Sequence, residues 1–162
     1  MIVIGSPGSG KSRFSRALHQ ATGLPLVHLD LLYWNADQTV VSRSVFLERL
    51  QEAVAQDAWI IDGNYDDLLQ ELRLAMADHI IFVMLPRIQC LFRALRRTKE
   101  RKAAGYQNDI NPWFIRFLLF DCRNSQRKKA YDIILNSYSN KCVVLKSQRD
   151  IDRFICDFSM LR

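Results

Sequence analysis

Gly5-Ser6-Pro7-Gly8-Ser9-Gly10-Lys11-Ser12, near the start of the chain, fits the phosphate-binding pattern G-x-x-x-x-G-K-[ST]. Its glycines allow the backbone to turn so that several N–H groups meet an anion without a Cβ in the way. The Lys11 ammonium can reach the β- and γ-phosphates of a nucleotide, and the Ser12 hydroxyl can bind Mg²⁺. We therefore expect residues 5–12, with Arg13 directly after them, to bind a nucleotide triphosphate and its magnesium ion.

The sequence on both sides of this loop agrees with that interpretation. Met1-Ile2-Val3-Ile4 is a short apolar run, as a buried parallel strand requires. After the loop, apolar residues recur at helical spacing from Phe14 to Ala21, and Gly23-Leu24-Pro25 is typical of a helix end. The pattern thus lies at a strand–loop–helix junction, where a helix N-terminus adds N–H groups and a positive dipole end.

Composition sets the protein class. The chain has 162 residues, 49% hydrophobic and 25% charged, which is typical of one globular domain spanning 1–162. No apolar run approaches the roughly 20 residues that span a membrane, and the first strand leaves no room for a signal peptide. The four cysteines are widely spaced in apolar surroundings, and we expect buried, reduced thiols, with a zinc site disfavoured. These features predict a cytoplasmic protein without a membrane partner.

Strand-like and helix-like patterns alternate along the whole chain. Apolar runs at 1–4, 26–29, 58–61, 79–84 and 141–146 predict strands. Apolar stripes at helical spacing predict helices at 45–56 and 66–76, after Pro86 (Ile88, Leu91, Phe92 and Leu95), and near 150–160. This alternation predicts an α/β fold in three layers, a parallel sheet with helices on both faces.

Positive charge is concentrated in one region. The net charge is +6, but residues 87–129 carry 12 Lys and Arg against three acidic residues, a balance of +9. Within this region, the polar segment 98–112 separates two helical patterns, and we expect it to be a mobile lid. The basic region has three possible roles: a solvated surface, a lid that closes over phosphates, or a surface that touches nucleic acid.

Two carboxylates follow predicted strands. Asp62 ends the run Trp59-Ile60-Ile61, where a P-loop fold places its second magnesium-organising acid; a helix-capping or turn residue before Gly63 is the alternative. Asp30 follows the previous strand and should face the crevice at the strand ends, where it could accept a proton from an attacking hydroxyl or hold magnesium. An ordinary turn residue is the alternative for Asp30. The next aromatic pair, Tyr33-Trp34, could stack on a ligand ring or pack in the core.

Arginines recur on both sides of the segment 98–112. Those before it lie three, four and eight residues apart and share a helix face: Arg93, Arg96, Arg97 and Arg101. Those after it fall in a narrow sector if 113–130 is one helix: Arg116, Arg123 and Arg127. Arginines on a closing lid stabilise the charge of a transferring phosphoryl group and exclude water. Solvated surface charges are the alternative for each of them.

The chain resembles the adenylate-kinase-like P-loop family of DNA topology modulation (FlaR-related) proteins over nearly its whole length. The resemblance rests on residues 5–12, 24–34 (LPLVHLDLLYW), 59–65 (WIIDGNY) and 77–87 (ADHIIFVMLPR). It implies a five-stranded sheet of order 2-3-1-4-5 with a small basic lid. It also implies that Arg93 lies over the adenine of ATP, with Ser147-Gln148-Arg149 beside it. Arg97, and one or more of Arg116, Arg123 and Arg127, would lie at the phosphates.

One difference from adenylate kinases concerns the acceptor. They read Asp-Gly-Phe-Pro-Arg where this chain reads Asp62-Gly63-Asn64-Tyr65-Asp66, and residues 31–42 contain no Lys or Arg. The motif and the resemblance together predict a P-loop kinase that transfers the γ-phosphoryl group of ATP·Mg²⁺ to a small acceptor. The acceptor would bear a hydroxyl or phosphate group, and nucleosides and nucleotides are among the candidates. Lys11, Asp30, Arg97, Arg123 and Arg127 are the candidate catalytic residues, and Ser12 and Asp62 the candidate metal ligands. The alternative is a nucleotide-gated, DNA-associated regulator, although the sequence contains no recognisable DNA-reading motif.

Overall fold

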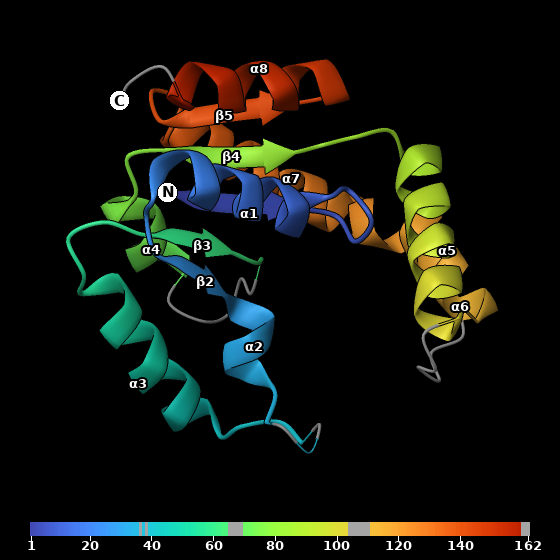
Figure 1. Cartoon of the computed structure of the whole chain (residues 1–162), viewed down its shortest axis with the longest axis horizontal. Helices are drawn as coiled ribbons and strands as arrows, with labels where there is room; N and C mark the ends of the chain where they lie inside the picture. Colours follow the sequence, from blue (N-terminus) through green and yellow to red (C-terminus); the bar gives the residue numbers. More distant parts are fainter. Residues whose placement is uncertain (36, 38, 65–69, 104–110, 160–162) are drawn as a thin grey trace.

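The computed structural model describes residues 1–35, 37, 39–64, 70–103 and 111–159 and contains a five-stranded parallel sheet covered by helices (Figure 1). The elements are β1 (Ile2–Gly5), α1 (Lys11–Thr22), β2 (Leu26–His28), α2 (Leu29–Tyr33), α3 (Arg43–Val54), β3 (Ile60–Asp62), α4 (Gln70–Met76), β4 (Ile80–Val83), α5 (Arg87–Ala103), α6 (Pro112–Leu119), the 3₁₀ turn η1 (Asp121–Arg123), α7 (Ser125–Ser137), β5 (Cys142–Leu145) and α8 (Gln148–Ser159). The strand order is β2-β3-β1-β4-β5, so the predicted α/β class and sheet order are confirmed.

Alternate residues of the central strands point into two separate cores. In β1, Ile2 and Ile4 join one buried cluster and Val3 joins the other. The first cluster includes Phe46 of α3 and Ile134 of α7, so these helices cover one face of the sheet. The second includes residues of α1 and α8, whose Phe14 and Phe154 rings lie 5.8 Å apart. Both faces of the sheet are therefore buried, as the continuous apolar strands predicted.

The carboxyl ends of the strands meet at one edge of the sheet, and the loop that follows β1 lies there. All strands run in the same direction, toward the side on which α5 and α6 stand in Figure 1. The first helix, α1, begins at Lys11 directly after the loop and ends at Gly23, whose φ of 73° is left-handed. The Gly23 N–H donates to the carbonyl oxygen of His19 at 2.7 Å, which closes the last turn as the sequence predicted.

Helix α5 differs from its predicted packing. Its apolar stripe was expected to face the core, but Ile88 and Phe92 are 63% and 66% exposed. The buried side chains are instead Cys90 and Ala94, because α5 leaves the sheet and packs against the loop after β1 and against α6. A small-residue face allows that close approach, and the large apolar side chains then face outward.

The expectation of one helix over 113–130 is wrong. Helix α6 ends where Phe120 adopts φ −125° and ψ −56°, and η1 and a second helix, α7, follow. Asn124 is the N-cap of α7, since its side chain accepts the Arg127 N–H at 2.9 Å. Arg116, Arg123 and Arg127 therefore lie on three different elements and do not share one helix face.

Other expectations lie partly outside the described residues. Residues 98–103 of the proposed lid continue α5 and Pro112 begins α6, whereas 104–110 are not described, so the lid remains a prediction. The helix expected at 66–76 is seen from Gln70. Cys156 is exposed, contrary to the expectation that all four cysteines are buried. Among the described helices, no helix has the length and apolar character needed to cross a membrane.

Candidate functional site

The loop between β1 and α1 has the backbone conformation of an anion-binding turn. Gly8 and Gly10 have φ of 76° and 92°, which residues with a Cβ rarely adopt. A Cβ on Gly8 would lie 2.2 Å from the carbonyl oxygen of Cys90, so the backbone of α5 packs directly against the loop. Gly10 is also the N-cap of α1, and the first N–H groups of a helix have no partner within it. The loop therefore presents backbone donors to a ligand.

Two side chains from distant segments hold the start of this loop. The Gly5 N–H donates to Oδ1 of Asn64 at 3.1 Å, and Asn64 Nδ2 donates back to the Gly5 carbonyl oxygen at 3.2 Å. Arg123 donates from Nε to Ser6 Oγ at 2.9 Å and from Nη2 to the Leu85 carbonyl oxygen at 2.6 Å. Arg123 was expected among the catalytic arginines, but it lies behind the loop and does not line the cavity in front of it.

Two buried cysteines lie beside Arg123. Burial raises the pKa of the Cys90 thiol, and the nearby Arg123 guanidinium opposes that rise only in part. The Cys122 thiol donates to the Leu118 carbonyl oxygen at 3.1 Å. A protonated, buried thiol is a poor nucleophile, so Cys90 acts in packing.

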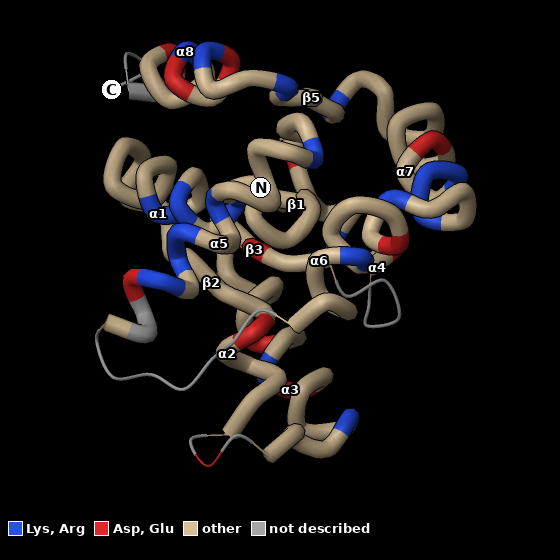
Figure 2. Tube along the Cα trace, turned by 90° about the vertical axis from the view of Figure 1, so that its right-hand side faces the viewer, with Lys and Arg blue, Asp and Glu red and all other residues tan. Residues whose placement is uncertain are grey.

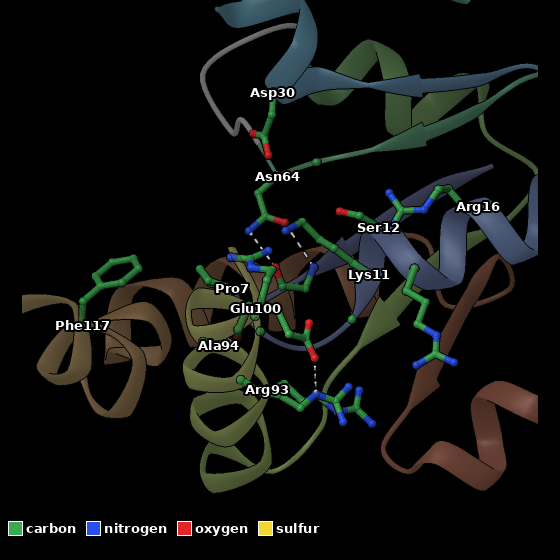
Figure 3. A pocket seen from close by; sticks show the side chains of 18 of the residues that line it. Pro7, Lys11, Ser12, Arg16, Asp30, Asn64, Arg93, Ala94, Glu100 and Phe117 are labelled. Carbon is green, nitrogen blue, oxygen red and sulfur yellow. Dashed lines mark hydrogen bonds and ion pairs between the residues drawn. The ribbon is translucent and has the colours of Figure 1, made fainter. Parts of the chain in front are cut away.

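A cavity of about 920 Å³ opens in front of the loop (Figure 3). Its walls are Gly5, Ser6, Pro7, Gly8, Gly10, Lys11, Ser12, Arg13, Arg16, Asp30, Gly63, Asn64, Arg93, Ala94, Arg96, Arg97, Glu100, Phe117 and Arg127. These residues come from the loop, α1, α2, the end of β3, α5, α6 and α7. The structure thus brings together most of the predicted site; Ser9, Asp62 and Arg123 are close by but outside the walls.

Five cations on the cavity wall have no hydrogen-bond or ion-pair partner among the described residues. Within the described parts of the chain, no hydrogen bond or ion pair engages the side chains of Lys11, Arg13, Arg16, Arg97 and Arg127. Arg97 lies on α5 and Arg127 on α7, whereas Lys11, Arg13 and Arg16 lie on α1. Unpaired cations grouped around one cavity attract anions such as nucleotide phosphates.

The remaining arginines of α5 are already engaged. Arg93 donates to the Ser9 carbonyl oxygen at 3.1 Å and to Gln148 Oε1 at 2.9 Å, which ties the loop to the start of α8. Its contact with Gln148 agrees with the predicted neighbourhood of Arg93 and 147–149. Arg96 forms an exposed ion pair with Glu100 at 3.4 Å, and such pairs contribute little.

The two predicted carboxylates occupy different environments. Asp30 is exposed on the cavity wall, in the first turn of α2 rather than in a simple turn. Asp62 is buried at the end of β3 with 4% of its surface exposed. Its Oδ2 is bonded to His28, while Oδ1 is buried and has no hydrogen-bond partner in the part of the chain that the structure describes. A buried carboxylate oxygen without a partner fits a cation or its bound water, so Asp62 and the Ser12 hydroxyl suit a magnesium ion.

The sequence analysis did not identify His28 as a site residue. His28 and Asp62 are register partners on β2 and β3, so their side chains lie on the same face of the sheet. His28 Nδ1 lies 2.8 Å from Asp62 Oδ2. A pairing of the two strands would have been needed to find this contact from the sequence.

The aromatic pair after Asp30 is divided between both of its possible roles. Tyr33 packs edge-on against the core ring of Phe46, with centroids 6.0 Å apart. Trp34 is 48% exposed and contacts Tyr33, with centroids 5.3 Å apart. Neither lines the cavity; the aromatic wall residue is Phe117, which stacks on Trp113 at 5.5 Å.

Comparison with known proteins identifies the fold. No protein-family profile and no curated protein matches the chain. Several solved structures do match. A gluconokinase from Sinorhizobium meliloti 1021 matches with a TM-score of 0.56 and 16% identity, over 98% of this chain and 88% of the other. A shikimate kinase from Bacteroides thetaiotaomicron matches with a TM-score of 0.53 and 14% identity over 99% and 96% of the chains. A Chloroflexus aurantiacus protein, whose kinase assignment is itself provisional, has a TM-score of 0.59 and 17% identity over 98% and 95%.

The fold is therefore that of the P-loop kinases, as the motif and the strand order predicted. Identities of 14–17% show the fold alone. The resemblance to the DNA topology modulation family remains a prediction.

Proposed function

We propose that the protein is an ATP-dependent phosphotransferase acting on a small hydroxyl- or phosphate-bearing acceptor. The observation that carries the proposal is the arrangement around the cavity. Lys11 and the glycine loop line it together with Arg97 and Arg127, which have no partner among the described residues, and with the exposed carboxylate of Asp30. This arrangement supplies the parts that in-line phosphoryl transfer needs: a phosphate cradle, charge stabilisation and a proton acceptor.

Binding comes first. In this proposal the loop N–H groups and Lys11 hold the β- and γ-phosphates, and Arg93, fixed by Ser9 and Gln148, lies toward the adenine. Ser12 and Asp62 hold Mg²⁺, which when bound offsets the charge of the phosphates. Arg123 positions the loop through Ser6 and does not touch the transferring group itself.

Transfer then needs one bond to form and one to break. The acceptor oxygen attacks the γ-phosphorus, the bond from that phosphorus to the β–γ bridging oxygen breaks, and ADP leaves with the bonding pair. The acceptor hydroxyl gives its proton to Asp30, while Arg97 and Arg127 stabilise the equatorial oxygens. A phosphate acceptor would attack as an anion and would not need the proton transfer.

The test is an ATP-consumption assay across nucleosides, nucleotides, sugars and hydroxy acids with Mg²⁺ present. We expect at least one acceptor to raise the rate of ADP formation well above the rate measured without an acceptor. The Lys11→Ala variant should lose that acceleration. A native protein that binds ATP but transfers to no compound, and shows no acceptor-dependent ADP formation, would leave the second candidate.

The second candidate is a nucleotide-gated regulator that binds DNA with little turnover. Exposed basic residues outside the cavity favour it, among them Lys128 and Lys129 of α7. Figure 2 shows Lys and Arg on several elements of the side that faces the viewer there. DNA binding that weakens steeply with salt and changes with ATP, without acceptor turnover, would support this candidate.

A further inference from the structure

The cavity carries more positive charge than ATP·Mg²⁺ can neutralise. Among the described residues, seven Lys or Arg side chains and two carboxylates, Asp30 and Glu100, line it, which leaves a balance of +5 for that part of the wall. ATP with one magnesium ion carries about two negative charges, so roughly three positive charges remain uncompensated. A neutral acceptor would leave this excess in a partly enclosed space, where like charges repel more strongly than in water.

Arg16 is the cation best placed for the acceptor. It lies one helical turn after Ser12 on α1, lines the cavity and has no partner among the described residues. Figure 3 shows Arg16 beside Ser12, on the side of the loop where Asp30 and Asn64 lie; Arg93 and Glu100 lie on the other. Residues 31–42, which follow Asp30, supply no Lys or Arg, so among the described residues the positive charge that lines the cavity on this side comes from α1.

We propose that the acceptor is a small anion, with a carboxylate or phosphate group besides the oxygen that is phosphorylated, and that Arg16 pairs with this group. The inference rests on the proposed function. A guanidinium can bind a carboxylate or phosphate through two parallel hydrogen bonds, which fixes orientation as well as charge. Arg16 would thereby hold the acceptor oxygen between Asp30 and the γ-phosphate.

Sulfate serves as the probe for the anion site. It is titrated by calorimetry into protein already saturated with Mg²⁺ and a non-hydrolysable ATP analogue, so that the loop is occupied. We expect one sulfate to bind and Arg16→Gln to weaken it at least about tenfold, with Lys128→Gln, an exposed cation outside the cavity, as the unchanged control. No sulfate binding, or equal binding by Arg16→Gln, overturns the inference.

Acceptor pairs that differ in charge provide the second measurement. Gluconate is compared with glucose, ribose 5-phosphate with ribose, and each nucleoside monophosphate with its nucleoside. Consumption of neutral members as efficiently as their anionic partners overturns the inference while the proposed kinase function stands. If the native protein does not bind the ATP analogue, both the proposed kinase function and the anionic acceptor are ruled out. That result is visible before sulfate is added.

A separate observation assigns a role to His28. His28 Nδ1 lies 2.8 Å from Asp62 Oδ2, and in the tautomer that carries its proton on Nδ1 the ring donates to the carboxylate oxygen. That bond occupies one carboxylate oxygen and fixes the side chain, while Oδ1 remains without a partner. We infer that His28 is a positioning residue that orients Asp62 toward the magnesium ion.

Variants of His28 separate this role from simple packing. Asn carries an amide N–H close to the position of Nδ1, whereas Leu has similar bulk without a donor. We expect His28→Leu to weaken Mn²⁺ binding to the ATP-analogue complex about 10–100-fold, measured by electron paramagnetic resonance, and His28→Asn to restore most of it. Val27→Ala, on the same strand and packed against the core, should lower the melting temperature without changing Mn²⁺ affinity.

Three results would contradict the positioning role of His28. Equal Mn²⁺ affinity of native and His28→Leu proteins overturns the positioning role, as does a His28→Asn variant that is no better than His28→Leu. A native protein that binds the ATP analogue but no Mn²⁺ overturns the metal site on which the role depends.

Discussion

The loop at residues 5–12 and the basic region formed by α5, α6 and α7 line one cavity, but their polar groups are held in opposite ways. The loop is fixed from behind by Asn64, Arg93 and Arg123, which bond to Gly5, Ser9 and Ser6. In the basic region, Arg97 and Arg127 have no partners among the described residues, and the large side chains of Ile88 and Phe92 are exposed.

The loop would position the phosphates, whereas the arginines would stabilise their charge. A cradle that must meet phosphate oxygens at hydrogen-bond distance gains from rigidity before the ligand arrives. Arginines that stabilise a transferring group are more useful when they can close on it, because closure excludes water at the moment of transfer. The unpaired cations are thus consistent with a ligand-dependent half of the site opposite a preformed half.

The largest expected effect concerns Lys11, the unpaired cation of the rigid half. Lys11→Ala should reduce turnover about 10³-fold or more and weaken ATP binding, because a phosphate-binding charge is lost. Its side chain supports no contact within the described structure, so the melting temperature should stay near the native value. Lys128→Ala is the matched control, and full activity in a folded Lys11→Ala protein would rule out this site.

The two carboxylates should have separable effects. Asp30→Asn should reduce transfer to a hydroxyl acceptor about 10²–10⁴-fold and leave ATP affinity near normal, since a positioned base is lost. Asp62→Asn should instead raise the Mg²⁺ concentration needed for half-maximal activity. Rates measured across Mg²⁺ concentrations, with the acceptor saturating, compare the two variants. Identical profiles would contradict this division, and Asp30 would then be a second magnesium-organising group or a structural residue.

Gly8 tests how tightly the loop and α5 are packed. Gly8→Ala would place a Cβ against the Cys90 carbonyl at a positive φ, and we expect a loss of about 3–5 kcal/mol in unfolding free energy. Gly23→Ala is the matched control. Its φ of 73° is similar but the site is exposed, so about 1–2 kcal/mol should be lost there. Denaturant unfolding measures both, and equal losses would argue against close packing.

Much of the rigid half could be predicted from the sequence because its signals are local. The motif, the strand before it and the helix after it are adjacent in the chain, and the glycine at position 23 ends α1 as its sequence indicates. The positions of Asp62 and Asp30 after predicted strands could be read for the same reason, since each residue follows an apolar run. Their surroundings were not found, because the His28 contact depends on how two strands pair.

The basic region was predicted less well because its arrangement depends on tertiary contacts. Helical periodicity identified the apolar stripe of α5, but the helix buries Cys90 and Ala94 against the loop instead. The break between α6 and α7 at Phe120–Asn124 also separated residues that one continuous helix would have aligned. Charge spacing therefore could not distinguish an arginine that faces the cavity from one that supports the loop.

The smallest expected effect tests that last distinction, between Arg123 and Arg127. Both were expected at the phosphates, but Arg123 bonds to Ser6 and Leu85 behind the loop, while Arg127 lines the cavity and has no partner within the described ranges. Arg123→Gln should lower the unfolding free energy by about 1–3 kcal/mol, because buried acceptors lose their donor. Arg127→Gln should change it by less than about 0.5 kcal/mol, as surface substitutions usually do.

Kinetics should reverse the order of the two variants. Arg127→Gln should lower kcat, since it removes charge opposite the transferring group, with the KM for ATP little changed. Arg123→Gln should mainly raise the KM for ATP, because a loosened loop binds phosphate less well before transfer begins. Unfolding curves and initial rates on the same preparations compare both quantities. An Arg123→Gln protein of native stability with a kcat defect like that of Arg127→Gln would show that Arg123 leaves Ser6 and reaches the phosphates during the reaction.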